Sequence, residues 1–244
     1  MTWWKTFFTK DYLTQYEKFL TPQRTQFELR AVVKALGIKK GMRVLDVPCG
    51  QGRISIGLAK KGCIVMGVDY SKYLLSVAKK RSGRLPIKFI HKDMRKINFN
   101  NEFDAAVNWF TSFGYFTVKE DKEFIKKIYR SLKKGGKFLL DVSHDTPRLG
   151  QIPPQGWMDC GDFVVLERRY YDDKNRTITN KRIFVFVKSG KRKAYEFIIR
   201  VYTPLELKQM LKNAGFKVLK VYGDYELKKF ALNSRRIIIL AQKQ

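Results

Sequence analysis

Aromatic and apolar residues recur three and four positions apart in the first part of the chain, beginning at Trp3. This spacing places them on one side of a helix. Thr21 followed by Pro22 is a helix-start signal, since the hydroxyl can cap the first turn and proline lacks only an N–H that has no partner there. The second helix is predicted to end at Gly37. Residues 1–40 are therefore predicted to form a helical N-terminal segment.

Between residues 42 and 142 the pattern changes to short apolar runs that alternate with amphipathic stretches of about 10–15 residues. Strands that alternate with helices of this length are joined by right-handed crossovers and form a mostly parallel sheet. This alternation predicts the α/β fold class. We predict strands at 42–47, 63–69, 87–91, 103–108 and 137–142, and helices at 51–61, 71–81 and 119–133.

Residues 143–202 interrupt this order. Their first part, up to residue 157, has the composition of a loop, and three β-rich runs separated by polar turns follow it. A capping box at Thr203 restarts the helical pattern, and two further strands bring the predicted sheet to seven. We therefore divide the chain into the helical segment 1–40, an α/β domain over 41–142 and 203–244, and an antiparallel β insertion over 143–202. The last two strands of the α/β domain are predicted at 216–222 and 235–242. The three β-rich runs of the insertion are at 163–171, 177–188 and 194–202.

The chain is strongly basic, since 50 Lys and Arg against 22 Asp and Glu give a formal net charge of +28 at pH 7. Such a field attracts nucleic acid, anionic lipid or anionic small molecules. The basic residues are spread along the whole chain without forming one block, which is typical of solvated faces in a lysine-rich proteome or a hot habitat. Charge alone therefore identifies no partner, and RNA stays an alternative to a small molecule.

Cysteine content and hydropathy bear on the cellular compartment in which the protein is expected. The three cysteines, Cys49, Cys63 and Cys160, are odd in number and widely spaced. This argues against a disulfide framework and a metal site and fits a reducing cytoplasm. The apolar run at 237–241 is far shorter than the roughly 18–20 residues of a spanning helix. We expect a cytoplasmic monomer or homodimer with no signal peptide, no membrane partner and no metal.

The most specific local signal is the segment 44–53, Val-Leu-Asp-Val-Pro-Cys-Gly-Gln-Gly-Arg, in which an apolar strand runs into a turn and then into a helix. Gly50 and Gly52 lack a Cβ and allow a ligand to approach the backbone closely. The helix that follows directs free N–H groups and the positive end of its dipole toward the turn, which suits a carboxylate. An ordinary turn that needs glycine for packing is the structural alternative.

Acidic residues follow three successive strands. Asp46 lies in the first strand, Asp69 ends the second, and Asp93 follows the third. Because the carboxyl ends of parallel strands share one edge of the sheet, we expect these side chains to meet there, where open α/β sheets bind ligands. A carboxylate at the end of the second strand can accept hydrogen bonds from both hydroxyls of a ribose. A cofactor that contains a nucleoside is therefore predicted at this edge.

Together with residues 132–139 and the helix-to-strand passage 207–218, these motifs resemble the class I S-adenosylmethionine (SAM)-dependent methyltransferases. The resemblance covers residues 40–142 and returns at 203–242. It implies a Rossmann-like, mostly parallel seven-stranded sheet, SAM as cofactor and S-adenosylhomocysteine as product. The resemblance places Asp46, Gly50 and Gly52 at the methionine end of SAM, Asp69 at the ribose, Asp93 and Met94 at the adenine and Asn108 near the donor methyl group, with Pro48, Cys49, Arg53, Tyr70 and Ser71 completing the cofactor-binding set.

One position departs from the family motif, because Pro48 stands where its first glycine is usual. Proline fixes φ near −65°, so the turn cannot take a positive φ at this residue. NAD is disfavoured as the cofactor, because a dinucleotide motif requires a third glycine where this chain has Ser55.

The segment after the fourth strand bears on the methyl acceptor. Family members that methylate exocyclic amines of nucleic acids carry Asn/Asp-Pro-Pro-aromatic here, and this chain has Asn108 without the prolines. Its aromatic residues would form a hydrophobic wall or a cage for a cationic amine, and core packing explains their spacing equally well. The substrate candidates are Trp109, Phe113, Tyr115, Trp157 and Arg168, with Arg148 and Arg200 as further candidates for the same cavity.

Three side chains are candidates for a catalytic role. His144 follows the fifth strand, where a general base would face a substrate, and a structural role in a turn or cap is the alternative. Tyr12 and Tyr16 lie on the N-terminal segment, which in small-molecule members of the family closes over the cofactor as a lid. Such members also often carry a β-rich insertion that cups the acceptor. Both features favour methyl transfer to an N or O atom of a small molecule; an RNA or protein methyltransferase and a SAM-binding protein without transferase activity are the alternatives.

Overall fold

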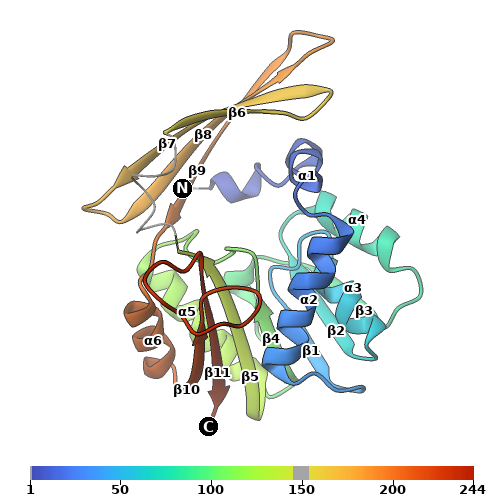
Figure 1. Ribbon diagram of the computed structural model, residues 1–244. Coiled ribbons are helices and arrows are strands. Elements are labelled where there is room, and N and C mark those ends of the chain that lie inside the picture. The colour runs from blue at the N-terminus through green and yellow to red at the C-terminus, as the bar shows by residue number, and fades with distance from the viewer. Residues whose placement is uncertain (1, 145–153) are drawn as a thin grey trace.

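The chain folds into two sheets, with helices around the larger one (Figure 1). The computed structural model describes residues 2–144 and 154–244. Helices flank both faces of a seven-stranded sheet, and a four-stranded antiparallel sheet lies beyond the edge at which the parallel strands end. The short helices of the N-terminal segment lie between the two sheets.

The seven strands of the large sheet run in the order β10-β11-β5-β4-β1-β2-β3. The neighbours among β1 to β5 pair in parallel, whereas β11 is antiparallel to both of its neighbours. This arrangement confirms the predicted Rossmann-like sheet. The strands span Arg43–Asp46 (β1), Ile64–Asp69 (β2), Ile87–His91 (β3), Phe103–Asn108 (β4), Leu132–Ser143 (β5), Phe216–Tyr222 (β10) and Arg236–Lys243 (β11).

Helices cover both faces of this sheet because its strands point alternate side chains into two separate cores. On β1, Val44 packs into the core that contains residues of α2 and α3, and Leu45 packs into the core that contains residues of α5 and α6. Both side chains are completely buried. The helices span Pro22–Leu36 (α2), Arg53–Lys60 (α3), Lys72–Ser82 (α4), Val118–Ser131 (α5) and Pro204–Asn213 (α6).

The predicted helix signals are confirmed for α2 and α6. The Thr21 hydroxyl accepts a 3.2 Å hydrogen bond from the N–H of Arg24, and Gly37 ends the helix with a φ of +67°. Thr203 and Glu206 form the predicted capping box at the start of α6. These helix boundaries follow from local sequence chemistry.

The small sheet has the order β6-β7-β8-β9 and is antiparallel throughout. The prediction of a loop up to residue 157 is wrong, because β6 begins at Gln155 and pairs Trp157 with Leu166 on β7. Gln155, Gly156 and Asp159 are poor strand formers, so β6 owes its conformation to pairing with β7 rather than to local propensity. The strands span Gln155–Asp159 (β6), Phe163–Asp172 (β7), Thr177–Phe186 (β8) and Arg192–Arg200 (β9).

Aromatic contacts pack the N-terminal segment between the sheets. The ring centroid of Trp3 lies 5.6 Å from that of Phe197 on β9 and 4.8 Å from that of Tyr115 in the loop after β4. The Trp4 ring lies 4.7 Å from that of Tyr70, directly after β2. The segment therefore joins the small sheet to the edge of the large one. Its helices are the 3-10 helix Trp3–Lys5 (η1) and Lys10–Glu17 (α1).

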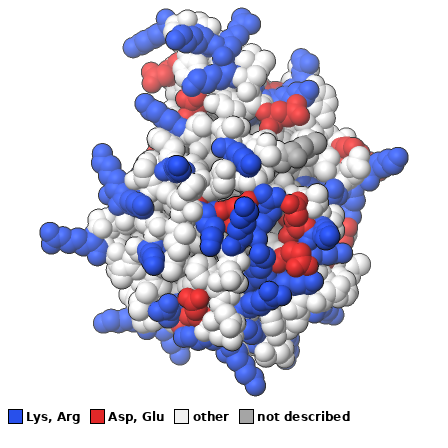
Figure 2. All heavy atoms as spheres, turned by 180° about the vertical axis from the view of Figure 1, so that it is seen from behind, with Lys and Arg blue, Asp and Glu red and all other residues white. Residues whose placement is uncertain are grey.

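Basic side chains are distributed over the surface. Figure 2 shows Lys and Arg on all parts of one face of the molecule, with Asp and Glu between them. This matches their spread along the sequence. Within residues 2–144 and 154–244, none of the helices has both the length and the apolar composition that crossing a membrane requires.

Candidate functional site

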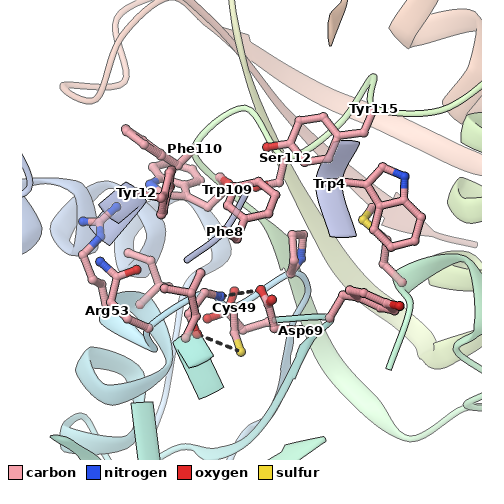
Figure 3. A pocket seen from close by; sticks show the side chains of 18 of the residues that line it. Trp4, Phe8, Tyr12, Cys49, Arg53, Asp69, Trp109, Phe110, Ser112 and Tyr115 are labelled. Carbon is pink, nitrogen blue, oxygen red and sulfur yellow. Dashed lines mark hydrogen bonds between the residues drawn. The ribbon is translucent and has the colours of Figure 1, made fainter. Parts of the chain in front are cut away.

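A cavity lies at the carboxyl edge of the large sheet, where β1, β2 and β4 end, and we call it the cofactor cavity (Figure 3). Polar groups of the turns after β1 and β2 form its floor. Trp4, Phe8 and Tyr12 of the N-terminal segment lie on its other side. The predicted cofactor residues that line it are Asp46, Pro48, Cys49, Gly50, Arg53, Asp69, Tyr70, Asp93 and Met94.

Asp69, the last residue of β2, is held by backbone donors on both oxygens. Its Oδ2 accepts a 2.8 Å hydrogen bond from the N–H of Gly50, and its Oδ1 accepts a 2.8 Å hydrogen bond from the N–H of Ser71. Each carboxylate oxygen has a second lone pair, which leaves both able to accept from a ligand hydroxyl. Burial raises the pKa of Asp69, and the backbone hydrogen bonds oppose this effect.

Asp46 ends β1 and is almost completely buried. Its Oδ2 accepts a 2.6 Å hydrogen bond from the hydroxyl of Ser55 on α3. Burial raises the pKa of Asp46 to about 7, although the Ser55 hydrogen bond opposes the shift. Asp46 therefore changes charge near neutral pH, and a cationic ligand group beside it would favour its ionised form.

The two glycines of the turn between β1 and α3 have different roles. Gly50 has a φ of +56°, and a Cβ there would meet no atom within 4 Å, so the space beside it is open. Gly52, with a φ of +79°, would place a Cβ 3.1 Å from Ala78 and 3.3 Å from Phe89. Gly52 therefore serves close packing. It does not line the cavity, although its predicted contact with the cofactor would require it to do so. In this turn the positive φ values occur at Gly50 and Gly52 and not at Pro48, so the proline is compatible with the turn.

Glu28 on α2 is a site residue that sequence reasoning missed. Its carboxylate is completely buried and accepts hydrogen bonds from Arg24 at 2.7 Å, from Arg53 at 3.0 Å and from the indole N–H of Trp109 at 3.1 Å. Arg53 and Trp109 both line the cofactor cavity. Glu28 therefore holds Arg53 and Trp109 in the wall of the cofactor cavity without lining the cavity itself.

Asp93, after β3, is paired within the protein. Arg95 donates to both of its oxygens, with the shortest contact at 2.7 Å. Burial raises the pKa of Asp93, but the Arg95 hydrogen bonds outweigh burial and bring the pKa below its usual value. The Arg95 guanidinium also lies 4.9 Å from the ring centroid of Trp4 and 4.4 Å from that of Phe116. This pairing ties the region predicted for adenine to the N-terminal segment.

A second cavity, of about 710 Å³, lies between the small sheet, the N-terminal segment and the loop after β4, and we call it the upper cavity. Its volume falls in the range of roughly 300–1,000 Å³ that is typical of small-molecule sites. Four aromatic residues line both cavities, and we call them the aromatic junction. They are Phe8, Tyr12, Phe110 and Tyr115.

Two of the predicted catalytic residues lie at the upper cavity. Tyr12 belongs to the aromatic junction, and burial, as the largest effect, raises the pKa of its hydroxyl well above the usual value. Tyr16 lines the upper cavity, and its hydroxyl accepts a 3.3 Å hydrogen bond from Arg182 on β8. Both tyrosines thus line the upper cavity, and their catalytic role stays a prediction.

His144, the third catalytic candidate, lines neither cavity. Its Nδ1 lies 2.9 Å from the carbonyl oxygen of Ser234, and its ring packs against Phe230. The cause is the length of β5, which extends to Ser143 and pairs there with Arg236 on β11. This pairing directs residue 144 toward the segment before β11, so the structure does not support His144 as a base that faces the substrate.

The five predicted substrate residues are divided between the cavities and the surface. Three line a cavity: Trp109, Phe113 and Tyr115. Trp157 is 73% exposed, and it shares the outer face of the small sheet with Arg168. Neither of these two lines a cavity, whereas Arg169, one position further along β7, lines the upper cavity, as does Arg200 on β9. Arg148 lies outside the described residues.

Two predicted cofactor residues lie behind the cavity wall. Asn108 is completely buried, and its Nδ2 donates a 2.9 Å hydrogen bond to the carbonyl oxygen of Val47. Ser71 caps α4, and its hydroxyl donates a 2.6 Å hydrogen bond to the carbonyl oxygen of Phe8. Both side chains support the turns that form the wall and do not line the cavity itself.

The residues of the cofactor cavity fit SAM in their chemistry. The buried Asp69 carboxylate retains free acceptor lone pairs for ribose hydroxyls. Asp46 provides a negative charge for a cationic group, and the space beside Gly50 is open. The indole N–H of Trp4 is buried without a hydrogen-bond partner among the described residues, so it is available to a ligand acceptor. The assignment of single residues to parts of SAM stays a prediction.

Comparison with known proteins shows relatives of one kind. Residues 44–136 match the family model of a methyltransferase domain. The methyltransferase-family protein YqeM of Bacillus subtilis (strain 168) is 33% identical over 211 residues, which cover 82% of this chain and 84% of YqeM. Homology therefore extends well beyond the matched domain.

Solved structures share the fold. A SAM-dependent methyltransferase from Clostridium acetobutylicum ATCC 824 has a TM-score of 0.81 at 21% identity, over 96% of this chain and 98% of the other. SAM-bound CalS10, an amino pentose methyltransferase from Micromonospora echinaspora, has a TM-score of 0.71 at 18% identity, over 96% and 97%. Together with the match to YqeM over most of both chains, these relationships show that the chain belongs to the class I SAM-dependent methyltransferases.

Proposed function

We propose that the protein transfers a methyl group from SAM to an N or O atom of a small molecule that binds in the upper cavity. The aromatic junction carries this proposal. Its four residues line both cavities, so ligands in the two cavities would meet there. Tyr12 and Tyr115 supply hydroxyl groups at this meeting point, and Phe8 and Phe110 supply apolar surface.

The chain's own residues have mainly to position the acceptor and exclude water. SAM supplies a methyl group that its sulfonium already activates. Holding an acceptor atom in line with that group is worth up to roughly 7–11 kcal/mol. The raised pKa of Tyr12 keeps its hydroxyl protonated at neutral pH. Tyr12 would therefore orient the acceptor by hydrogen bonding and would not act as a base.

The division of the chain supports a small acceptor. We assign residues 1–40 to a lid, residues 143–202 to a cover over the acceptor, and residues 41–142 with 203–244 to the SAM-binding domain. Support comes from Trp3, which contacts both Phe197 of the insertion and Tyr115 of the junction. CalS10, which acts on an amino pentose, shares this fold along nearly its whole length.

RNA or protein as the acceptor is the main alternative, and the net charge of +28 favours it. The basic residues, however, are mixed with acidic ones across the face that Figure 2 shows. The aromatic junction lines a cavity whose other walls come from the N-terminal segment and the small sheet, which favours an acceptor small enough to enter it. A SAM-binding protein without transferase activity is the second alternative.

Methyl-labelled SAM distinguishes these alternatives. The purified protein and labelled SAM are incubated in three separate reactions. Each reaction contains one fraction of a cell extract: small molecules, RNA or protein. We expect label in the small-molecule products and, at a SAM concentration that does not saturate the wild type, about tenfold less label when Asp69 is replaced by Ala. Label confined to RNA or protein would replace the proposal by the first alternative. SAM binding without transfer to any fraction would favour the second.

A further inference from the structure

Phe110 and Thr111, in the loop after β4, both have a positive φ, of +61° and +58°, and we call them the strained turn. This left-handed conformation is unfavourable for residues with a Cβ, whereas glycine adopts it freely. Throughout residues 2–144 and 154–244, no other two consecutive non-glycine residues share it. Strained backbone persists only where its surroundings hold it, and it is concentrated at functional sites. The strained turn therefore indicates a side chain whose position matters to function.

Asp141 on β5 bonds to both residues of the strained turn. Its Oδ2 accepts a 2.9 Å hydrogen bond from the N–H of Phe110, and its carbonyl oxygen accepts a 3.1 Å hydrogen bond from the N–H of Thr111. The Asp141 side chain is completely buried, and Arg236 on β11 donates to Oδ1 at 2.8 Å and to Oδ2 at 2.6 Å. Arg236 also donates a 3.0 Å hydrogen bond to the Thr111 hydroxyl. We call Asp141 and Arg236 the turn clamp.

The turn clamp is fixed by the large sheet and not by the turn itself. β5 and β11 pair along their length, with Asp141 opposite Ile238 and Arg236 opposite Ser143. A guanidinium that donates to both oxygens of a carboxylate sets the direction of the carboxylate as well as balancing its charge. Two neighbouring strands therefore hold the strained turn in a conformation for which glycine would be expected.

The strained turn brings the ring of Phe110 to the aromatic junction, where it lines both cavities. The guanidinium of Arg53, which lines the cofactor cavity, lies 5.5 Å from its ring centroid (Figure 3). The ring centroid of Tyr16, which lines the upper cavity, lies 6.1 Å from it. Phe110 is thus held by its backbone and by contacts of its ring with residues of both cavities.

From this arrangement we propose that Asp141 is a positioning residue for methyl transfer, which acts through the strained turn to hold the Phe110 ring against the acceptor beside SAM. Glycine at position 110 would adopt the same conformation without strain but would remove the ring. A displacement of about 1 Å in a bound reactant can lower a rate by roughly 100-fold, so a fixed ring at this place has a large effect on transfer. The inference rests on the proposed function, because it takes the upper cavity as the acceptor site.

A matched pair of glycine variants separates the ring from the strain. Phe110→Gly and Leu227→Gly each remove a half-buried apolar side chain at a positive φ, of +61° and +64°, but Leu227 lines neither cavity. With saturating labelled SAM and the small-molecule fraction of a cell extract, Phe110→Gly is expected to lower the rate of transfer by about tenfold or more. Leu227→Gly should keep a rate near that of the wild type. Equal rates in the two variants would show that the strained turn serves only the fold and would overturn the inference.

Asp141→Asn tests the turn clamp itself, because an amide accepts hydrogen bonds at only one of its two polar atoms. With saturating S-adenosylhomocysteine in the cofactor cavity, we expect its affinity for the fluorescent probe 8-anilinonaphthalene-1-sulfonate, an aromatic ligand for the upper cavity, to fall by about tenfold. Addition of Thr111→Gly, which lets the turn keep its conformation without the clamp, should restore part of the affinity, whereas addition of Leu227→Gly should restore none. Wild-type affinity in a folded Asp141→Asn variant, or equal affinities in the two double variants, would contradict the inference.

The outcome is separable from that of the proposed function. Probe affinities that follow the substitutions in the turn, together with methyl label only in RNA or protein, would refute the proposed function and leave a clamp that shapes a binding cavity. Label in small molecules at a rate that Phe110→Gly does not lower would refute the positioning role alone. Should Asp141→Asn fail to fold, the comparison of Phe110→Gly with Leu227→Gly still decides.

Discussion

The N–H of Gly50 donates a 2.8 Å hydrogen bond to Oδ2 of Asp69, and this bond ties the turn after β1 to the end of β2. The two residues are thereby held on the floor of the cofactor cavity, with open space beside Gly50. The bond occupies one lone pair of the oxygen and orients the carboxylate. The same contact that stabilises the turn thus prepares Asp69 to accept hydrogen bonds from a ligand.

Replacement of Asp69 by Ala is expected to weaken SAM binding by about tenfold or more, because charge-assisted hydrogen bonds are worth roughly 1.5–3 kcal/mol each. Isothermal titration with SAM and S-adenosylhomocysteine measures the change, with NAD as the negative control ligand. Asp104→Ala, at the opposite end of β4 and partly exposed, is the control for removal of a carboxylate. Unchanged affinity in a folded Asp69 variant would remove this residue from the site.

Asp46 is expected to make SAM binding depend on pH. Because its pKa lies at about 7, the carboxyl group is neutral below that pH and negative above it. A cationic ligand favours the negative form, so affinity should rise from pH 6 to pH 8, by at most about tenfold per pH unit below the pKa. Titrations across this range should show the rise for the wild type and a flat profile for Asp46→Asn. The same slope in both proteins would assign the titration to another group.

Much of this site is predictable from local sequence. Asp46 and Asp69 stand at strand ends, and strand order alone brings such residues to one edge of a parallel sheet. The helix caps at Thr21 and Thr203 depend on nearby residues only. The position of the cofactor cavity at the carboxyl edge of the large sheet is therefore predictable from the sequence alone.

The face of each insertion strand was not predictable, because a shift of one residue exchanges inside and outside. Arg168 points to the outer face and Arg169 lines the cavity, although both are arginines on one strand. Glu28 gives no sequence signal either, since its burial depends on how α2 packs against α3. His144 illustrates the same limit, because the pairing of β5 with β11 decides its direction.

Asp121 is expected to lower the stability of the wild type as pH rises. It is completely buried, and burial raises its pKa to about 7, although the Tyr202 hydrogen bond and Arg200 oppose the shift. An unfolded chain releases this proton near pH 4, so between about pH 4 and 7 the folded state binds more protons. Stability contributed by the neutral form is therefore lost through this window, by up to about 4 kcal/mol.

The variant Asp121→Asn stays neutral at every pH and removes this loss. Urea unfolding at pH 5 and pH 8 should therefore show a variant that is slightly more stable than the wild type at the lower pH and more stable by a clearly larger margin at the higher pH. Asp104→Asn, which removes a partly exposed carboxylate, is the control and should show no such gain. A variant that is less stable than the wild type at pH 8 would show that the ionised carboxylate is useful to the fold.

Gly114 links the loop after β4 to the small sheet, because its carbonyl oxygen accepts a 2.8 Å hydrogen bond from the N–H of Arg200 on β9. Its φ is +93°, and a Cβ would lie only 2.5 Å from the Arg200 carbonyl oxygen. Gly114→Ala must therefore displace β9 at Arg200 as well as strain its own backbone, whose cost alone is roughly 1–2 kcal/mol. Gly161→Ala separates the two effects, since Gly161 also has a positive φ, of +81°, but open space around its Cβ position.

Both glycine variants should lose stability, but only Gly114→Ala should weaken binding in the upper cavity. We expect its affinity for the fluorescent probe 8-anilinonaphthalene-1-sulfonate to fall by about tenfold or more, because Ile199 and Val201, which line the cavity on either side of Arg200, move with its backbone. SAM affinity should stay near the wild-type value, since neither residue lines the cofactor cavity. Equal losses of probe affinity in the two variants would trace the effect to general destabilisation, and a parallel loss of SAM affinity in Gly114→Ala would show that the two cavities are not independently held.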